Sequence, residues 1–121
     1  MIKVAINGFG RIGRMVLRSI IENKIKSIKV VAINNRADTG TSAFLLEKDT
    51  IHGNLNMSVQ FDKKSIKVAG QNILCFHESD PENLPWKKLG VDIVFECTGK
   101  FNSKEQSSKH LLAGAKRVLV S

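Results

Sequence analysis

The chain has 121 residues, of which 42% are hydrophobic and 25% are charged, a balance that excludes an intrinsically disordered chain and is typical of one globular domain. The net charge of +8 comes from basic residues spread along the sequence, without an arginine-rich run or any tyrosine, so we do not expect a nucleic-acid partner. The sequence offers neither a membrane span nor a targeting segment, and we expect a cytoplasmic protein with no membrane partner.

The sequence begins with a predicted strand and a predicted helix. Residues Ile2 to Ile6 are apolar apart from Lys3, which is typical of a buried parallel strand. From Arg11 to about Ile25, apolar residues recur at helical spacing and predict an amphipathic helix. The side chains expected to face the core are Ile12, Val16 and Ile20. Those expected on the other side are Arg11, Arg14, Arg18 and Glu22.

Strands and helices alternate along the rest of the chain. A strand at 28–34 is followed by capping residues at 38–42 and a helix to about Glu47. Three short strands, at 57–61, 65–70 and 72–76, indicate an antiparallel meander. The remaining segments are a turn-rich loop at 80–85, a buried strand at 92–99, a helix from a cap at Ser103 to about Leu112, and a strand at 116–121.

This order of elements predicts an α/β fold with a Rossmann-type, doubly wound, mostly parallel sheet and a short antiparallel β insertion. We assign residues 1–121 to one dinucleotide-binding domain and expect it to be incomplete at its C-terminus, with the last strand inside the sheet. Because such sheets bind ligands beyond the carboxyl ends of their strands, four places are candidates for the site. They are Gly8–Gly13, Asn34–Arg36, Thr98–Phe101 and Ser121.

The stretch GFGRIG, which follows the first strand, matches the pattern G-x-G-x-x-G. Gly8 would form the tight turn, Gly10 would let the backbone approach a pyrophosphate, and Gly13 would let the helix pack closely on the strand. Backbone N–H groups near Arg11 and Ile12, at the positive end of the helix, would hold the anion. The pattern predicts dinucleotide binding because it joins a strand to a helix and a second strand follows.

The end of the second strand carries the residues that would contact the adenosine ribose. An acidic residue there accepts hydrogen bonds from the 2′-hydroxyl and repels a 2′-phosphate. This sequence has Asn35 at that position, with Arg36 beside it. Asn35 keeps a hydrogen bond without the repulsion, and Arg36 can pair with a phosphate, so NAD or NADP is the expected cofactor. The alternative is that Asn35 caps a turn and Arg36 faces water.

Six blocks of the sequence resemble phosphorylating glyceraldehyde-3-phosphate dehydrogenase. They are INGFGRIGR, VVAIN, KDTIHG, DPENLPW, ECTGKF and AGAKRVLVS, which occur in the family's order and spacing over the whole chain. Erythrose-4-phosphate dehydrogenases share the same blocks, and the stretches NRAD and LPWKKLGVDIVF are closer to them. The resemblance implies a glycolytic, cytoplasmic oxidoreductase that works as a homotetramer and takes a sugar-phosphate substrate when a second domain is present.

The resemblance also assigns roles to residues by their position. Arg11 and Ile12 would contact the pyrophosphate through their backbone, and Asn35 stands where the family usually has an acidic ribose ligand. Ser79 stands where many members have a basic residue beside the adenine. The remaining cofactor contacts would come from Thr98, Gly99, Phe101 and, near the nicotinamide, Ser121.

No catalytic residue is expected in this chain. The family's nucleophilic cysteine, its activating histidine and its aldehyde-phosphate ligands follow in a second domain, so the resemblance implies that these 121 residues are inactive alone. Cys75 and Cys97 are predicted to be reduced, buried thiols without a disulfide or a metal ion. His52, His77 and His110 are predicted to have surface or capping roles.

Two other functions stay open at this point. One is a non-catalytic nucleotide-binding module that uses the same pocket, which the length of the chain and its positive charge favour. The other is a different glycine-loop dehydrogenase, of the aspartate-semialdehyde or homoserine type. The blocks KDTIHG and ECTGKF argue against this last class.

Overall fold

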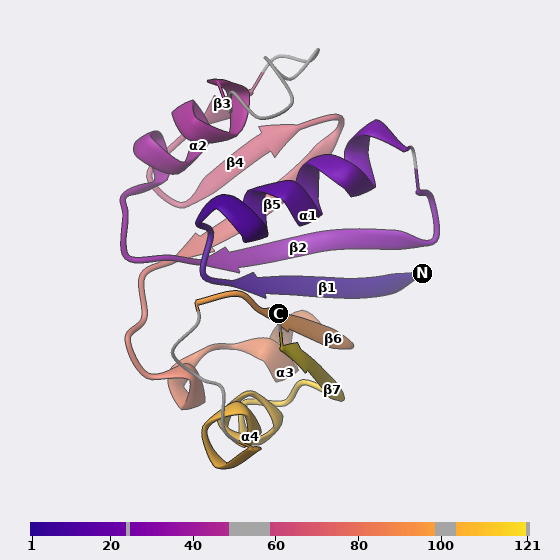
Figure 1. Ribbon diagram of the computed structural model, residues 1–121, viewed down its shortest axis with the longest axis vertical. Coiled ribbons are helices and arrows are strands. Elements are labelled where there is room, and N and C mark those ends of the chain that lie inside the picture. Colours follow the sequence, from indigo (N-terminus) through magenta and orange to yellow (C-terminus); the bar gives the residue numbers. More distant parts are fainter. Residues whose placement is uncertain (24, 49–58, 99–103, 121) are drawn as a thin grey trace.

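The computed structural model describes residues 1–23, 25–48, 59–98 and 104–120. Within these ranges one sheet is formed, with the strand order β3-β4-β5-β2-β1-β6-β7. Helices lie on both sides of this sheet (Figure 1), as in a doubly wound fold of the Rossmann type. The fold class predicted from the sequence is therefore confirmed.

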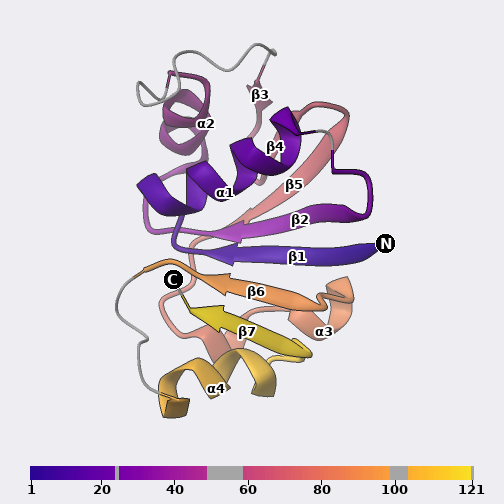
Figure 2. The same cartoon turned by 45° about the vertical axis from the view of Figure 1, so that its right-hand side comes forward.

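The parallel part of the sheet is built around its first strand. β1 (Ile2–Asn7) lies between β2 (Ile28–Asn34) and β6 (Ile93–Glu96). β5 (Gln71–Phe76) extends the sheet beyond β2, and β7 (Arg117–Val120) extends it beyond β6. The arrowheads of β1, β2, β6 and β7 point the same way in Figure 2, so the carboxyl ends of these strands gather at one edge.

The antiparallel insertion occupies the other end of the sheet. β3 (Gln60–Phe61) pairs with β4 (Ser65–Val68), and β4 pairs with β5, both in antiparallel fashion. The predicted meander is therefore present. Its third strand, however, also pairs in parallel with β2 and so belongs to the main sheet, which the spacing of the short strands did not predict.

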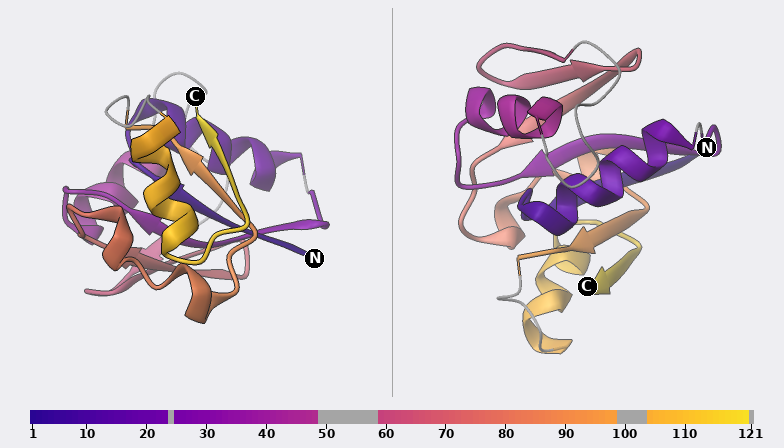
Figure 3. Two further views of the ribbon diagram at one scale, coloured as in Figure 1. Left: turned by 90° about the horizontal axis from the view of Figure 1, so that it is seen from below. Right: turned by 45° about the horizontal axis from the view of Figure 1, so that its top comes forward.

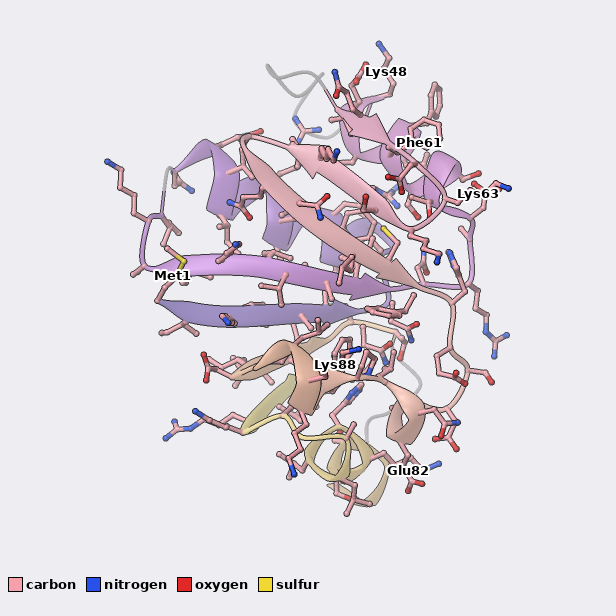
Figure 4. All side chains as sticks on the ribbon, turned by 180° about the vertical axis from the view of Figure 1, so that it is seen from behind. Met1, Lys48, Phe61, Lys63, Glu82 and Lys88 are labelled. Atoms are coloured by element: carbon pink, nitrogen blue, oxygen red, sulfur yellow. The ribbon has the colours of Figure 1, made fainter. Side chains whose placement is uncertain are left out.

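Helices cover the sheet from two sides. α1 (Arg11–Glu22) and α2 (Thr39–Lys48) lie on one side, while α3 (Trp86–Leu89) and α4 (Lys104–Leu112) lie on the other, as Figure 3 shows from two directions. Figure 4, drawn from behind, shows Lys88 of α3 on the face opposite to α1. This arrangement covers both faces of the central strands β1 and β2, which explains the apolar runs at 4–6 and 30–33 within them.

Each face of the sheet has its own apolar core. Successive residues of a strand point to opposite faces, so Ile6 packs toward α1 and α2 whereas Ala5 packs toward α3 and α4. On the second face, Ala5 and Ala32 leave room for the indole ring of Trp86, which is fully buried. The single tryptophan of the chain thus lies in the core directly behind the central strands.

Helix α1 departs from the predicted amphipathic pattern at two positions. Ile12, predicted to face the core, is 52% exposed, and Arg18, predicted to lie on the polar side, is 1% exposed. The guanidinium of Arg18 donates to the Glu22 carboxylate and to the carbonyl oxygen of Leu46, each at 3.3 Å. These acceptors compensate for the burial of the charge, so the helix carries an arginine on its inner side. The helix also ends at Glu22 rather than near Ile25.

Several elements in the second half of the chain differ in position or length from those predicted. β7 is the edge strand among the described residues rather than an interior strand, with Leu119 and Val120 about half exposed. The predicted loop at 80–85 contains a 3₁₀ turn at Pro81–Asn83 and leads directly into α3, and the predicted strand at 92–99 is regular only over β6. Residues 57–58 and the predicted cap at Ser103 lie outside the described residues.

Candidate functional site

A pocket of about 260 Å³ opens at the carboxyl ends of the parallel strands. β1 leads into α1 on one side of the sheet, and the neighbouring strand β6 is followed by α4 on the other side, so the connections diverge between β1 and β6. Ligands of open α/β sheets bind at such switch points. The residues that line the pocket are Asn7, Gly8, Gly10, Asn34, Asn35, Arg36, Glu78, Ser79, Pro81, Cys97 and Thr98.

The three glycines of the GFGRIG stretch differ in what a side chain would meet at each position. Gly8 has a φ of +91°, and a Cβ there would lie 2.6 Å from the Thr98 methyl group, so it fits the turn closely against the end of β6. A Cβ on Gly13 would lie only 2.4 Å from the carbonyl oxygen of Gly8, so this glycine lets α1 pack on the turn. A Cβ on Gly10 would meet no atom within 4 Å, because Gly10 faces the open pocket.

The first turn of α1 lies beside the pocket. Gly10 is the N-cap residue, and within the described part of the chain no side chain caps this helix and no acidic residue stands in its first turn. The first N–H groups of a helix lack intrahelical acceptors, and they carry the positive end of the helix dipole. Arg11 and Ile12, which supply two of these groups, are exposed. This end of α1 therefore suits an anion.

The predicted ribose-contacting residues lie at the rim of the same pocket. Asn35 is half-buried, its side-chain amide lies 3.5 Å from the Ser42 hydroxyl, and its carbonyl oxygen accepts a hydrogen bond from His77 Nδ1 at 2.9 Å. Arg36 and Ser79 are exposed and line the pocket from either side. The cap of α2 comes from Asp38 instead, whose carboxylate accepts the N–H of Thr41 at 2.7 Å. Asn35 is thus not the residue that caps this helix.

A buried carboxylate, that of Glu96, contacts residues that line the pocket without lining it itself. Glu96 is the last residue of β6 and is 1% exposed. Its Oε1 accepts from the Asn7 amide at 2.6 Å and from His110 Nε2 at 2.8 Å, while its Oε2 accepts from the N–H and the hydroxyl of Thr98 at 3.0 and 2.6 Å. Burial by itself raises the pKa of Glu96, but the hydrogen bonds from His110, Thr98 and Asn7 outweigh it, and the pKa lies below its usual value of 4.5.

The network continues from Glu96 to the neighbouring strand and to the core. Asn34, at the end of β2, donates to the Asn7 side-chain oxygen at 2.7 Å and accepts the N–H of Glu78 at 2.8 Å. On the other side, His110 Nδ1 accepts from Trp86 Nε1 at 3.0 Å. His110 is fully buried, so its predicted surface or capping role is wrong. His77 is exposed, as predicted, and His52 lies outside the described residues.

The structure brings together most of the described residues that the sequence singled out. Gly8, Gly10, Asn35, Arg36, Ser79 and Thr98 line one pocket, and Arg11, Ile12 and Gly13 belong to the helix turn beside it. Three further candidates lie outside the described residues: Gly99, Phe101 and Ser121. The sequence analysis missed Asn7 and Glu96, and it named Asn34 only as the first residue of the candidate stretch Asn34–Arg36. Their signal is a polar residue at the last position of an apolar strand.

The two cysteines differ in their surroundings. Cys75 is buried as predicted, and burial raises the pKa of its thiol to about 11, so a thiolate is disfavoured. Cys97 is only partly buried and lines the pocket, which corrects its prediction as a core thiol. Neither forms a disulfide bond, and the described residues contain no cluster of three or more potential metal ligands. Among these residues, no helix has the length and apolar character that crossing a membrane requires.

Comparison with known proteins agrees with this geometry. Residues 2–104 match the family model described as the NAD-binding domain of glyceraldehyde 3-phosphate dehydrogenase. Over the whole chain, the sequence is 50% identical to glyceraldehyde-3-phosphate dehydrogenase of Thermotoga maritima, of which it covers 36%. It is 48% identical to the Geobacillus stearothermophilus enzyme over 99% of the chain and 35% of that relative, and 46% identical to the Clostridium pasteurianum enzyme over 100% and 36%.

These matches confirm two expectations drawn from the sequence, the resemblance to this dehydrogenase family and the binding of NAD. The chain spans only 35–36% of the length of the relatives named here. The family model that it matches describes their NAD-binding domain. The chain belongs to the glyceraldehyde 3-phosphate dehydrogenase family and corresponds to its NAD-binding domain.

Proposed function

We propose that residues 1–121 form one dinucleotide-binding domain, that the pocket at the β1–β6 switch point holds the cofactor, and that the protein containing this chain is a phosphorylating glyceraldehyde-3-phosphate dehydrogenase. One observation carries the proposal. The pocket gathers the glycine turn after β1, the Asn35–Arg36 pair after β2, Ser79 after β5 and Thr98 after β6. A dinucleotide is long enough to need contacts from several strand ends, and this edge supplies them together.

The residues present fit a pyrophosphate at the start of α1. The open space at Gly10 lets a phosphate approach the backbone, and the first N–H groups of α1 lack a side-chain cap within the described residues. In this proposal Arg11 and Ile12 contribute backbone N–H groups, while Gly8 forms the turn that lines the pocket and Gly13 lets α1 pack on that turn. When bound, NAD supplies the acceptor for a hydride.

The adenosine half would lie toward β2 and β5, and the nicotinamide half toward β6. Asn35 would hydrogen-bond a ribose hydroxyl, and Ser79 would lie beside the adenine. Because the usual carboxylate is replaced by an amide and Arg36 is exposed at the pocket, we propose that the site also accepts NADP. Thr98 would lie toward the nicotinamide, and we assign Gly99, Phe101 and Ser121 to the same half from their sequence positions.

The chemistry proposed for the whole protein is the oxidation of an aldehyde sugar phosphate, with glyceraldehyde 3-phosphate favoured over erythrose 4-phosphate because the relatives named above carry the former name. Neither described cysteine is suited to be the nucleophile: Cys75 is buried with a raised pKa, and Cys97 stands next to Thr98 in the cofactor pocket. We therefore propose that the 121-residue chain alone binds NAD without turning over substrate. A homotetramer, a cytoplasmic location and a role in glycolysis belong to the same proposal.

Titration calorimetry with NAD tests the site. Gly10→Val fills open space and requires no unusual backbone angle, since Gly10 has a φ of −82°, so the fold should persist while the pyrophosphate is excluded. Ser19→Val is the control, because it adds a similar side chain to an exposed position of α1 that does not line the pocket. NAD binding should be lost only in Gly10→Val. Equal affinity in both variants would place the cofactor elsewhere.

A further inference from the structure

The buried polar residues behind the pocket form a connected set, which we call the buried network. Its members are Asn7, Asn34, Glu96, Thr98, His110 and Trp86. Asn7, Asn34 and Thr98 line the pocket, whereas Glu96, His110 and Trp86 do not. The network therefore joins the floor of the proposed cofactor site to α3 and α4 on the far side of the sheet.

The hydrogen bonds fix which tautomer His110 adopts. The indole N–H of Trp86 is a donor only, so Nδ1 of His110 must be the acceptor across their 3.0 Å contact. The ring proton therefore resides on Nε2, which donates to Glu96 Oε1 at 2.8 Å. The amide of Asn7 lies 3.3 Å from the same Nε2, and both groups direct their hydrogens to Oε1. The tautomer of His110 and the orientation of Glu96 are thus set together.

Glu96 fits this environment only as a carboxylate. Each of its two oxygens accepts two hydrogen bonds from described residues, one oxygen from Asn7 and His110 and the other from Thr98. A glutamine amide in either orientation would turn an NH₂ group toward two donors. The carboxylate consequently holds Asn7 of β1 and Thr98 after β6 in one fixed relation, across the switch point where the pocket opens.

We propose that Glu96 and His110 are positioning residues for the dinucleotide, which rests on the proposed cofactor site. Neither contacts the pocket, yet together they set where Asn7 and Thr98 lie at its floor. Trp86 acts one step further back, because its indole N–H selects the His110 tautomer that donates to Glu96. The affinity for NAD then depends on side chains that the cofactor never touches.

The test compares two substitutions at His110 in the protein at its native length. His110→Gln can still donate to Glu96, whereas His110→Leu removes the donor and keeps an apolar side chain. NAD affinity from calorimetry should fall about tenfold in His110→Leu, the size of coupling within one hydrogen-bond network, and should largely be retained in His110→Gln. Glu96→Gln should lose at least as much affinity as His110→Leu.

Val91→Ala is the matched control for lost stability. Val91 packs in the same apolar cluster as Trp86 but is not part of the buried network, so this variant should be destabilised with unchanged NAD affinity. Histidine ring ¹⁵N spectra give a second readout, because the wild-type protein should show His110 protonated on Nε2 and Trp86→Phe should release that preference.

Each outcome has a distinct meaning. Loss of NAD binding in Gly10→Val, together with normal affinity in folded His110→Leu, would overturn the positioning role while the cofactor site stands. Normal affinity in Gly10→Val would overturn the site itself. Equal affinity losses in His110→Gln and His110→Leu, or a loss in Val91→Ala, would reduce the network to a structural role and overturn the proposal. If Glu96→Gln does not fold, the His110 pair carries the test alone.

Discussion

Replacing Gly13 by alanine should destabilise the protein although alanine is the better helix former. In an open helix this change gains about 1 kcal/mol. Here the new methyl group would lie 2.4 Å from the Gly8 carbonyl oxygen and 3.1 Å from the Ile6 methyl group, well inside contact distance. Relieving this contact requires α1 to move away from β1, and such overpacking costs about 1–3 kcal/mol. Since α1 packs on the apolar core that contains Ile6, the cost should exceed the helix-propensity gain, and we expect a net loss of up to about 2 kcal/mol.

Urea unfolding followed by circular dichroism measures this loss. Gly10→Ala is the control, because the same methyl group added at Gly10 meets no atom within 4 Å. The control should change the free energy of unfolding by about 1 kcal/mol or less, the range expected at a helix N-cap. A Gly13→Ala variant as stable as the wild-type protein would refute the claim that close packing of α1 on the Gly8 turn requires glycine there.

Three further predictions concern the pocket and its support. The affinity for NADP, measured by calorimetry, should lie within about tenfold of the affinity for NAD. Asn35→Asp should lower the NADP affinity by about tenfold or more, and Arg36→Ala should lower the NADP affinity alone. A wild-type preference for NAD that neither substitution shifts would contradict this prediction. N-ethylmaleimide should modify Cys97 faster than Cys75 in peptide mass mapping, and NAD should slow only the reaction at Cys97; equal rates would count against the pocket. Because the folded pKa of Glu96 is lowered, its stabilisation is present above its usual value of 4.5 and is lost as pH falls through the lower folded value. Unfolding of a folded Glu96→Gln variant should therefore depend less on pH in this acidic window, and an unchanged profile would show that Glu96 is not a source of acid lability.

The first half of the fold could be predicted from the sequence because its signals are local. The second strand was predicted at 28–34 and is found at Ile28–Asn34, because the apolar run at 30–33 within it is typical of a buried parallel strand. The turn at Gly8 and the close packing at Gly13 followed from the glycine spacing, and the geometry now gives each a steric reason. Such features depend on residues within one strand, one turn and one helix.

The errors arise where the decisive partner is distant in sequence. Helical periodicity assigned Arg18 to the polar side, but one of its acceptors, the carbonyl oxygen of Leu46, lies on α2. His110 was assigned to a surface or cap, but its partners Glu96 and Trp86 come from β6 and α3. A polar residue in the core is stable only when such partners are satisfied, and single-sequence patterns do not show which distant residues will meet it.

The buried network also explains why the same strand ends serve both the fold and the site. Asn7 stands opposite Asn34 in the pairing of β1 with β2, and opposite Glu96 in the pairing of β1 with β6. Asn34, Asn7 and Glu96 thus form a row across three strands, in which Asn34 donates to Asn7 and Asn7 donates to the Glu96 carboxylate. Aligned donors strengthen one another in a buried environment, so the row offsets the cost of ending three apolar strands in polar residues. Because Thr98 completes the row at the switch point, the hydrogen bonds that align the three strands also place the floor of the pocket.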